Sequence, residues 1–168
     1  MIIGIGGISN AGKSTLARRI KNHYSSKSVS IICQDDYAVA TEKIPTINDH
    51  ADWERPESIN FSLYEKVVKE EIEKSEIVII EGIFAFYKNN LLEIMDKKIY
   101  LNLDNKSFIM RKKNDFRWGQ EPDWYIEHIW KSHYKYCYNN IPKDALVINA
   151  NNDIDINVVL DFLSGNQE

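Results

Sequence analysis

Apolar runs of four or five residues alternate along this chain with longer segments in which apolar positions recur every three or four residues. The short runs predict five β-strands, at residues 1–5, 29–33, 77–80, 99–103 and 145–148. The longer segments predict helices at residues 13–24, 62–74, 91–95, 108–116, 124–138 and from 156 onwards. Strands that are apolar throughout are typical of a sheet covered on both faces. Their alternation with helices predicts an α/β fold with a parallel sheet, formed by a single domain over residues 1–168.

The helical period also predicts which side chains face the core. For the helix at 62–74, which a Ser62–Glu65 capping box would begin, the predicted inward residues are Leu63, Val67, Val68 and Ile72. For the helix at 124–138 they are Ile126, Ile129, Trp130, Tyr134 and Cys137. For the last helix they are Ile156, Val159, Leu160 and Leu163.

The composition is that of an ordinary globular protein, with 43% apolar and 27% charged residues and a net charge of −4. This mildly acidic balance argues against a nucleic-acid coat or a membrane-surface role, and no apolar run approaches the ~20 residues of a membrane span. Cys33 and Cys137 lack disulfide or zinc spacing, and His128 and His133 fit helix-face positions better than metal ligation. We therefore expect a cytoplasmic protein with neither nucleic acid nor membrane as a partner.

The first strand and the first helix enclose a complete G-x-x-x-x-G-K-S sequence, at residues 7–14. Glycines let the backbone curl so that N–H groups point at phosphate oxygens, and the helix adds its free N-terminal donors. Lys13 would reach the β- and γ-phosphates of ATP, and the Ser14 hydroxyl would bind Mg²⁺. The predicted nucleotide contacts are Gly7, Ser9, Asn10, Ala11, Gly12, Lys13, Ser14 and Thr15. The predicted fold is therefore that of a P-loop NTPase, with helices flanking the sheet and a small lid.

Two further strands end in acidic residues. Asp35 and Asp36 follow the second strand, and Glu81 ends the third. In open α/β sheets, ligands bind beyond the carboxyl ends of the strands. Glu81 can hold Mg²⁺ beside Ser14, and a carboxylate after the second strand can accept a proton from an attacking hydroxyl. If the backbone there is extended, only one of the adjacent acids faces the acceptor, and we choose Asp35. The alternatives are turn-capping acids after the second strand and a surface acid at Glu81.

Two segments outside the strands and core helices are candidates for substrate contacts. Residues 38–60 have no clear period, and loops of this length are often functional. Residues 111–122 begin with a basic cluster, and such a lid can close over the nucleotide and neutralise charge on the transferred phosphoryl group. We assign Arg111 to nucleotide binding and Arg117 to catalysis. The alternative is that Arg111, Lys112, Lys113 and Arg117 form a solvated helix face.

Several blocks of sequence resemble uridine kinases and the related nicotinamide riboside kinases. They are the phosphate loop, Q-D-D-Y at 34–37, W-E-R-P at 53–56, E-G-I-F-A-F-Y at 81–87 and H-I-W-K-S-H-Y-K-Y at 128–136. The resemblance implies transfer of the ATP γ-phosphate to the 5′-hydroxyl of a nucleoside, with Asp35 as the base and Ser14 and Glu81 serving Mg²⁺. It also implies that Trp53 lies against the base ring and that Glu54 binds the ribose hydroxyls. The same blocks place Asp36, Tyr37 and Tyr87 among the acceptor contacts.

This sequence departs from uridine kinases at positions that bear on the acceptor. Glu54 stands where the family usually has Asp, and Asn114, Trp118 and Gln120 stand where uridine kinases tend to have arginines. These differences weaken the assignment to uridine more than the assignment as a kinase, and a flat cationic ring such as nicotinamide would suit Trp53.

Other functions remain open at this point. They are a different small-metabolite kinase and a nucleotide-binding regulatory protein without catalysis. A GTPase-like switch would need D-x-x-G and N-K-x-D motifs, which this sequence lacks. The sequence does not decide between a monomer and a homo-oligomer.

Overall fold

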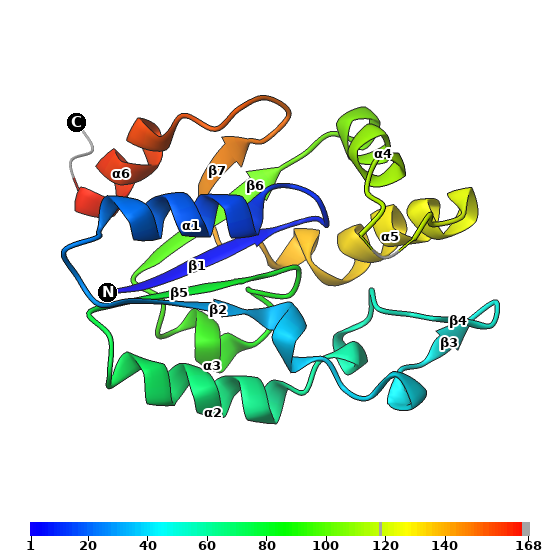
Figure 1. Cartoon of the computed structure of the whole chain (residues 1–168), viewed down its shortest axis with the longest axis horizontal. Coiled ribbons are helices and arrows are strands. Elements are labelled where there is room, and N and C mark those ends of the chain that lie inside the picture. The colour runs from blue at the N-terminus through cyan, green and yellow to red at the C-terminus, as the bar shows by residue number, and fades with distance from the viewer. Residues whose placement is uncertain (118, 166–168) are drawn as a thin grey trace.

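A five-stranded parallel sheet forms the centre of the molecule (Figure 1). In this computed structural model, which describes residues 1–117 and 119–165, the strands run in the order β2-β5-β1-β6-β7. They are β1 (Ile2–Gly7), β2 (Val29–Cys33), β5 (Ile77–Gly82), β6 (Lys97–Asn102) and β7 (Leu146–Asn149). The predicted five-stranded parallel α/β fold is therefore confirmed.

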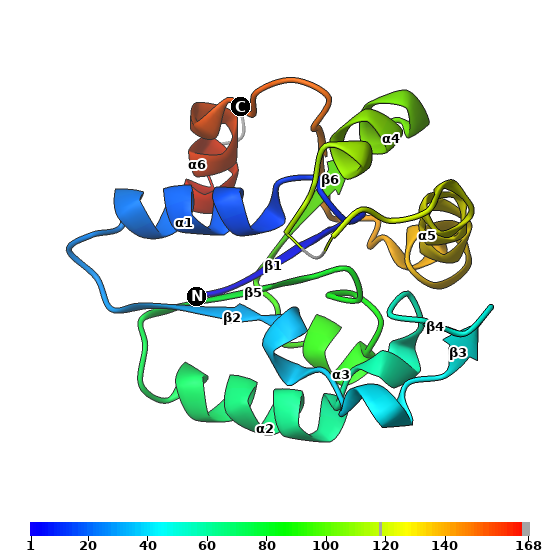
Figure 2. The same ribbon diagram turned by 45° about the vertical axis from the view of Figure 1, so that its right-hand side comes forward.

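Helices cover both faces of this sheet and its carboxyl end (Figures 1 and 2). On one face lie α1 (Lys13–His23) and α6 (Ile156–Ser164), and on the other α2 (Phe61–Ile72) and α3 (Asn89–Leu92). Beyond the carboxyl ends of the strands lie α4 (Asn105–Lys113) and α5 (Asp123–Tyr136). Among the described residues no helix is both long enough and apolar enough to cross a membrane.

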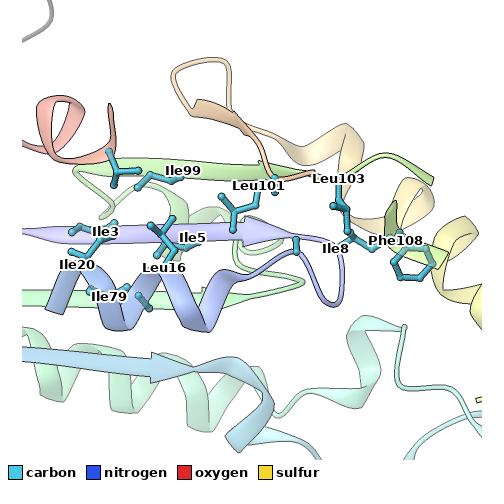
Figure 3. Close-up of a cluster of buried hydrophobic side chains, with 14 of the residues drawn as sticks. Ile3, Ile5, Ile8, Leu16, Ile20, Ile79, Ile99, Leu101, Leu103 and Phe108 are labelled. Carbon is cyan, nitrogen blue, oxygen red and sulfur yellow. The ribbon is translucent and has the colours of Figure 1, made fainter. Parts of the chain in front are cut away.

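The core consists of two apolar clusters, one on each face of the sheet, because successive strand side chains point to opposite sides. The cluster under α1 contains alternate residues of three strands, and Figure 3 shows Ile3, Ile5, Ile79, Ile99 and Leu101 packed against Leu16 and Ile20. The cluster under α2 contains the intervening strand residues Val78, Ile80 and Tyr100. Fully apolar strands therefore result from burial on both faces, as their sequence predicts.

The start of α2 and its buried face differ from the prediction. The helix begins at Phe61, and the Asn60 side chain caps it by accepting a hydrogen bond from the Leu63 N–H at 3.2 Å. The predicted cap, Ser62, is therefore two residues beyond the observed one. Leu63 is 46% exposed, whereas Tyr64 and Val68 are fully buried. Tyr64 and Val68 are four residues apart, so they share the face of α2 that packs on the sheet, whereas Leu63 lies on another face.

The buried face of α5 also differs from the predicted stripe. Tyr134 is 41% exposed, and the neighbouring His133 is buried instead. The His133 Nε2 atom lies 2.6 Å from the Tyr100 hydroxyl, so the imidazole has a hydrogen-bond partner inside the core. Burial lowers the pKa of His133 to about 4, which keeps the ring neutral. A hydrophobic pattern misses such a residue because a paired histidine can replace an apolar side chain.

The predicted irregular segment 38–60 contains a short hairpin, β3 (Thr46–Ile47) and β4 (His50–Ala51). The two residues between these strands, Asn48 and Asp49, have φ angles of 49° and 60°. Positive φ at both central residues is the requirement of a type I′ hairpin turn, which asparagine and aspartate tolerate better than other residues. Figure 2 shows the hairpin next to α5, far from the sheet.

Candidate active site

The sequence at 7–14 forms a tight loop between β1 and α1. Gly12 immediately precedes α1 and has a φ of 97°, a left-handed conformation that glycine adopts without strain. The Lys13 ammonium group folds back and donates to the Ile8 carbonyl at 3.0 Å. Ser14 and Thr15, in the first turn of the helix, are exposed. The loop backbone and the helix N-terminus are therefore shaped to receive an anionic phosphate group.

Glu81 lies beside this loop on β5. In the parallel pairing of β2 with β5, Glu81 stands opposite Cys33, and in the pairing with β1 it stands opposite Ile5. Only 2% of Glu81 is exposed, and its Oε1 atom has no hydrogen-bond partner. A buried carboxylate oxygen without a partner is costly, and a divalent cation with oxygen ligands would satisfy it. Glu81 and the exposed Ser14 hydroxyl therefore offer oxygen atoms suited to a divalent cation such as Mg²⁺.

Gln34 fixes the loop that follows β5. Its side chain is fully buried, and its Oε1 atom accepts a hydrogen bond from the Phe84 N–H at 2.9 Å. A Cβ atom at Gly82 would lie 2.5 Å from the Gln34 Cβ atom, so no other residue fits there without displacing Gln34. The Q-D and E-G blocks, far apart in sequence, are therefore packed directly against each other.

Extended backbone was expected for the two acids after β2, but their backbone is not extended. Residues Gln34–Tyr37 form a 3₁₀-helix, in which successive side chains are about 120° apart, so Asp35 and Asp36 need not face opposite sides. Both acids are exposed. The Asp35 charge helps to raise the pKa of Glu54, which burial raises most, whereas the Asp36 charge acts in the same sense on the pKa of Tyr37. These effects couple Asp35 to Glu54 and Asp36 to Tyr37, and both partners are candidate acceptor contacts.

Glu54, in the 38–60 segment, is affected by the charge of the phosphate-loop lysine. Its side chain is half-buried, and burial raises its pKa to about 7. The ammonium groups of Lys112 and Lys13 oppose this rise, and the carboxylates of Asp52 and Asp35 add to it. The charges of Lys13 and Asp35 thus act on Glu54, although the three residues come from separate parts of the chain.

Lys112 is a site residue that the sequence analysis assigned only to a basic cluster. It is 8% exposed, and its Nζ atom lies 3.9 Å from Glu121 Oε1. Its position in the second half of α4 turns it inward, while its neighbour Lys113 is exposed and pairs with Asp123 at 2.8 Å. Sequence gives no signal that separates these two adjacent lysines, because helix orientation decides which of them is buried.

The two arginines of the predicted lid have different surroundings. Arg111 donates to the Asn10 carbonyl at 3.2 Å and to the Ala150 carbonyl at 2.7 Å, so it ties the phosphate loop to the end of β7. Arg117 instead binds Asp115 through two hydrogen bonds of 2.7 Å, and its side chain is 69% exposed. Asp115 in turn accepts a hydrogen bond from the Asn10 amide at 2.8 Å. The lid therefore contacts the phosphate loop through Arg111 and Asp115 rather than through Arg117.

The aromatic candidates lie in separate groups. Trp53 is 38% exposed, and its backbone N–H donates to the Tyr125 hydroxyl at 3.2 Å. Tyr87 is 39% exposed and stacks on Phe61 with ring centroids 5.7 Å apart. The half-buried Tyr37 packs against Tyr64. Trp118, which stands where uridine kinases tend to have an arginine, lies outside the described residues.

Comparison with protein families gives a match to the Phosphoribulokinase / Uridine kinase family over residues 68–117. This range contains β5 with Glu81, the E-G-I-F-A-F-Y block, and the start of the lid.

Curated relatives match over a larger part of the chain. A uridine kinase of Lactobacillus helveticus is 30% identical over 144 residues, which are 70% of this chain and 68% of the relative. Human nicotinamide riboside kinase 1 is 29% identical over 154 residues, 80% of this chain and 75% of the relative. A uridine kinase of Chlamydia pneumoniae is 29% identical over 138 residues, 67% of this chain. The matched region spans only 62% of that Chlamydia protein's length.

Solved structures share the fold at lower identity. A shikimate kinase from Bacteroides thetaiotaomicron superimposes with a TM-score of 0.65 at 20% identity, covering 99% of this chain and 96% of that one. A possible uridine kinase from Bacillus stearothermophilus gives a TM-score of 0.60 at 18% identity, covering 89% and 88%. At such identities these structures support the sheet topology and not a substrate.

Proposed function

Because the chain belongs to the phosphoribulokinase and uridine kinase family, we propose that it transfers the γ-phosphate of ATP to the 5′-hydroxyl of a nucleoside or a nucleoside-like riboside. The observation that carries this proposal is that the phosphate loop with Lys13 follows β1 and Asp35 follows β2, on either side of β5, and that the charges of both residues act on the half-buried Glu54. A phosphate-binding lysine, a candidate base and a candidate hydroxyl acceptor are the three parts that such a transfer needs.

In this proposal the loop at residues 7–14 and Lys13 bind the β- and γ-phosphates, and Arg111 keeps the loop in place. Glu81 and Ser14 would hold Mg²⁺, which neutralises phosphate charge and orients the nucleotide when bound. Asp35 accepts the proton of the acceptor's 5′-hydroxyl as its oxygen forms a bond to the γ-phosphorus. The bond from that phosphorus to the β,γ-bridging oxygen breaks, and ADP leaves.

Arg117 would contribute charge to the transferred phosphoryl group only after its pair with Asp115 opens, because both carboxylate oxygens now occupy its guanidinium group. We therefore assign to Arg117 a role that depends on lid movement. Asp115 itself contacts the phosphate loop in this structure, through the Asn10 amide.

The acceptor in this proposal binds with its ribose hydroxyls on Glu54 and its ring near Trp53, with Asp36, Tyr37 and Tyr87 around it. Hydrogen bonds from hydroxyls to an ionised carboxylate are stronger than those to neutral acceptors. The carboxylates of Asp52 and Asp35 both act on Glu54, and an acidic site of this kind favours an uncharged or cationic acceptor over an anionic one. An exposed tryptophan beside these acids suits a cationic pyridinium ring, as in nicotinamide riboside.

The experiment is a measurement of ADP release from ATP and Mg²⁺ with a panel of ribosides, including uridine and nicotinamide riboside and their 2′-deoxy and 3′-deoxy counterparts. We expect ADP release that depends on the riboside and falls by at least tenfold without a hydroxyl that Glu54 binds, since buried acceptors are then left unpaired. Lys13→Ala should remain folded and release no ADP.

Two outcomes would instead indicate a nucleotide-binding regulatory protein. One is ADP release at the same rate with and without a riboside, and the other is no ADP release from folded wild-type protein that binds ATP. Equal turnover of ribosides and their deoxy counterparts would place the acceptor's hydroxyls away from Glu54.

A further inference from the structure

The acceptor segment 38–60 is attached to α5 by polar contacts rather than to the sheet. The Tyr125 hydroxyl accepts from the Trp53 N–H and donates to the Ala51 carbonyl, each at 3.2 Å. The His50 ring packs on the Tyr125 ring at 4.1 Å between centroids, and its Nε2 atom lies 3.4 Å from Glu121 Oε2. The backbone around Trp53 and Glu54 is therefore held in place by a helix that lies just beyond the lid.

One carboxylate oxygen in this interface has two partners. Asp52 Oδ1 lies 2.7 Å from His128 Nε2 on α5, and it also accepts a hydrogen bond from the Glu54 N–H at 3.3 Å. Asp52 is 5% exposed, and its own N–H donates to the Pro45 carbonyl at 2.7 Å. The Ser132 hydroxyl lies 3.3 Å from the same His128 nitrogen. A single buried atom thus connects α5 to the backbone of Glu54.

Two of the three cations near this pair, Arg55 and Lys131, have acidic partners of their own. A cavity of about 280 Å³ between the segment and α5 is lined by Asp52, Arg55, His128, Lys131, Ser132, Lys135 and Tyr136. Arg55 pairs with Glu57 at 2.8 Å and Lys131 with Glu127 at 2.7 Å. Among the described residues, the closest basic atom to the Asp52 carboxylate is therefore His128 Nε2. Hydrogen bonds to a buried charged group are among the stronger ones in proteins.

We propose that Asp52 and His128 form a positioning pair, which holds the backbone of Glu54 so that its carboxyl group meets the acceptor's hydroxyls. This inference rests on the proposed function, because it concerns the residue that binds the acceptor there. Neither member of the pair touches the acceptor. They influence acceptor binding only through the position of Glu54. A small displacement of a positioned group can lower the rate by as much as 10²-fold.

The first test compares steady-state constants of His128→Leu with those of wild type. We expect KM for the riboside to rise at least tenfold, and both kcat and KM for ATP to change less than threefold, because the pair acts on the acceptor side alone. His128→Gln, which keeps an N–H donor of similar reach, should restore riboside KM to within about threefold of wild type. Lys131→Gln, on the same cavity wall, is the matched control and should change nothing.

The second test is a double-mutant cycle. If the pair acts through Glu54, then Glu54→Gln combined with His128→Leu should raise riboside KM no more than Glu54→Gln does alone. Additive effects would overturn the proposal, and so would a loss of kcat and ATP affinity in parallel with riboside affinity. If His128→Leu does not fold, Asp52→Asn takes its place in the cycle, since it keeps a carbonyl acceptor for the Glu54 N–H but loses the charge.

A third measurement needs no substrate. The Glu54 amide, which donates to Asp52 Oδ1, should exchange with deuterated solvent at least tenfold faster in His128→Leu than in wild type or Lys131→Gln. Unchanged exchange would overturn the positioning pair. Wild-type protein that phosphorylates no riboside would instead overturn the proposed function, so the two failures are distinguishable.

Discussion

Some of the proposed site residues occupy positions where burial of an ionisable group costs folding free energy. Glu54 is the clearest example, because burial raises its pKa to about 7. The folded protein therefore holds a proton at Glu54 that the unfolded chain, with an ordinary glutamate value of 4.5, has released. Protons bound more tightly by the folded state make stability fall as pH rises between those two values. The ionised form that binds hydroxyls best is thus the form that destabilises the empty site.

We therefore predict that Glu54→Gln raises the free energy of unfolding relative to wild type at pH 8, by at most about 3 kcal/mol, and by clearly less at pH 5. Denaturant unfolding of both proteins at the two pH values measures this difference. Glu42→Gln, which removes an exposed acid of the same segment, is the control and should show no such pH dependence. An equal effect of Glu54→Gln at both pH values would contradict the raised pKa.

The adjacent acids after β2 give a second prediction. Asp35 lies within the charge environment of Glu54, whereas Asp36 acts on Tyr37, so we expect Asp35→Asn to lower kcat about 10²–10⁴-fold, the usual range for a lost general base. Asp36→Asn should lower it far less. Steady-state assays of both variants, each checked for folding by circular dichroism, decide between them. If Asp36→Asn is the more damaged variant, the base has been assigned to the wrong residue.

Among the larger elements, the lid and the phosphate loop are joined through Asn10, which has a φ of 60°, a conformation that asparagine adopts more readily than most other non-glycine residues. The Arg111 guanidinium donates a hydrogen bond to the Asn10 carbonyl, and the Asp115 carboxylate accepts one from the Asn10 side-chain amide. The Arg117 guanidinium holds the pKa of Asp115 well below its usual range, so this link is ionised across the working pH range.

We predict that Asp115→Ala raises KM for ATP at least threefold and leaves KM for the riboside within about twofold, because Asn10 loses a restraint on the nucleotide side only. Asp123→Asn removes an exposed acid that pairs with Lys113 at 2.8 Å, and it serves as the control with unchanged constants. A rise in riboside KM of the same size would show that the lid restrains both substrates together.

At the scale of the whole molecule, the sheet places residues from distant parts of the chain at one edge. The parallel order β2-β5-β1-β6-β7 puts the carboxyl ends of β2, β5 and β1 next to one another. Asp35, Glu81 and the phosphate loop follow those three ends, so their proximity results from strand order. The acceptor segment 38–60 is held from outside the sheet, by its attachment to α5.

The sequence by itself determined the five strands, their parallel arrangement and the phosphate loop, because these depend on local patterns. Apolar runs such as Ile77–Ile80 occur where both faces of a strand are buried, and a loop with Gly12 and Lys13 requires its residue types at fixed spacing. Helix faces were less predictable. Leu63 and Tyr64 are adjacent and both apolar in character, and only the packed core selects the tyrosine.

Only the tertiary structure decided how the acceptor side is built. Lys112 rather than Lys113 is buried because α4 docks in one orientation, which no local pattern specifies. Asp52 and His128 are 76 residues apart, and no sequence motif predicts that they are in contact. Their contact depends on how a segment without a hydrophobic period settles against α5, and that is determined by a few long-range hydrogen bonds rather than by the order of the residues along the chain.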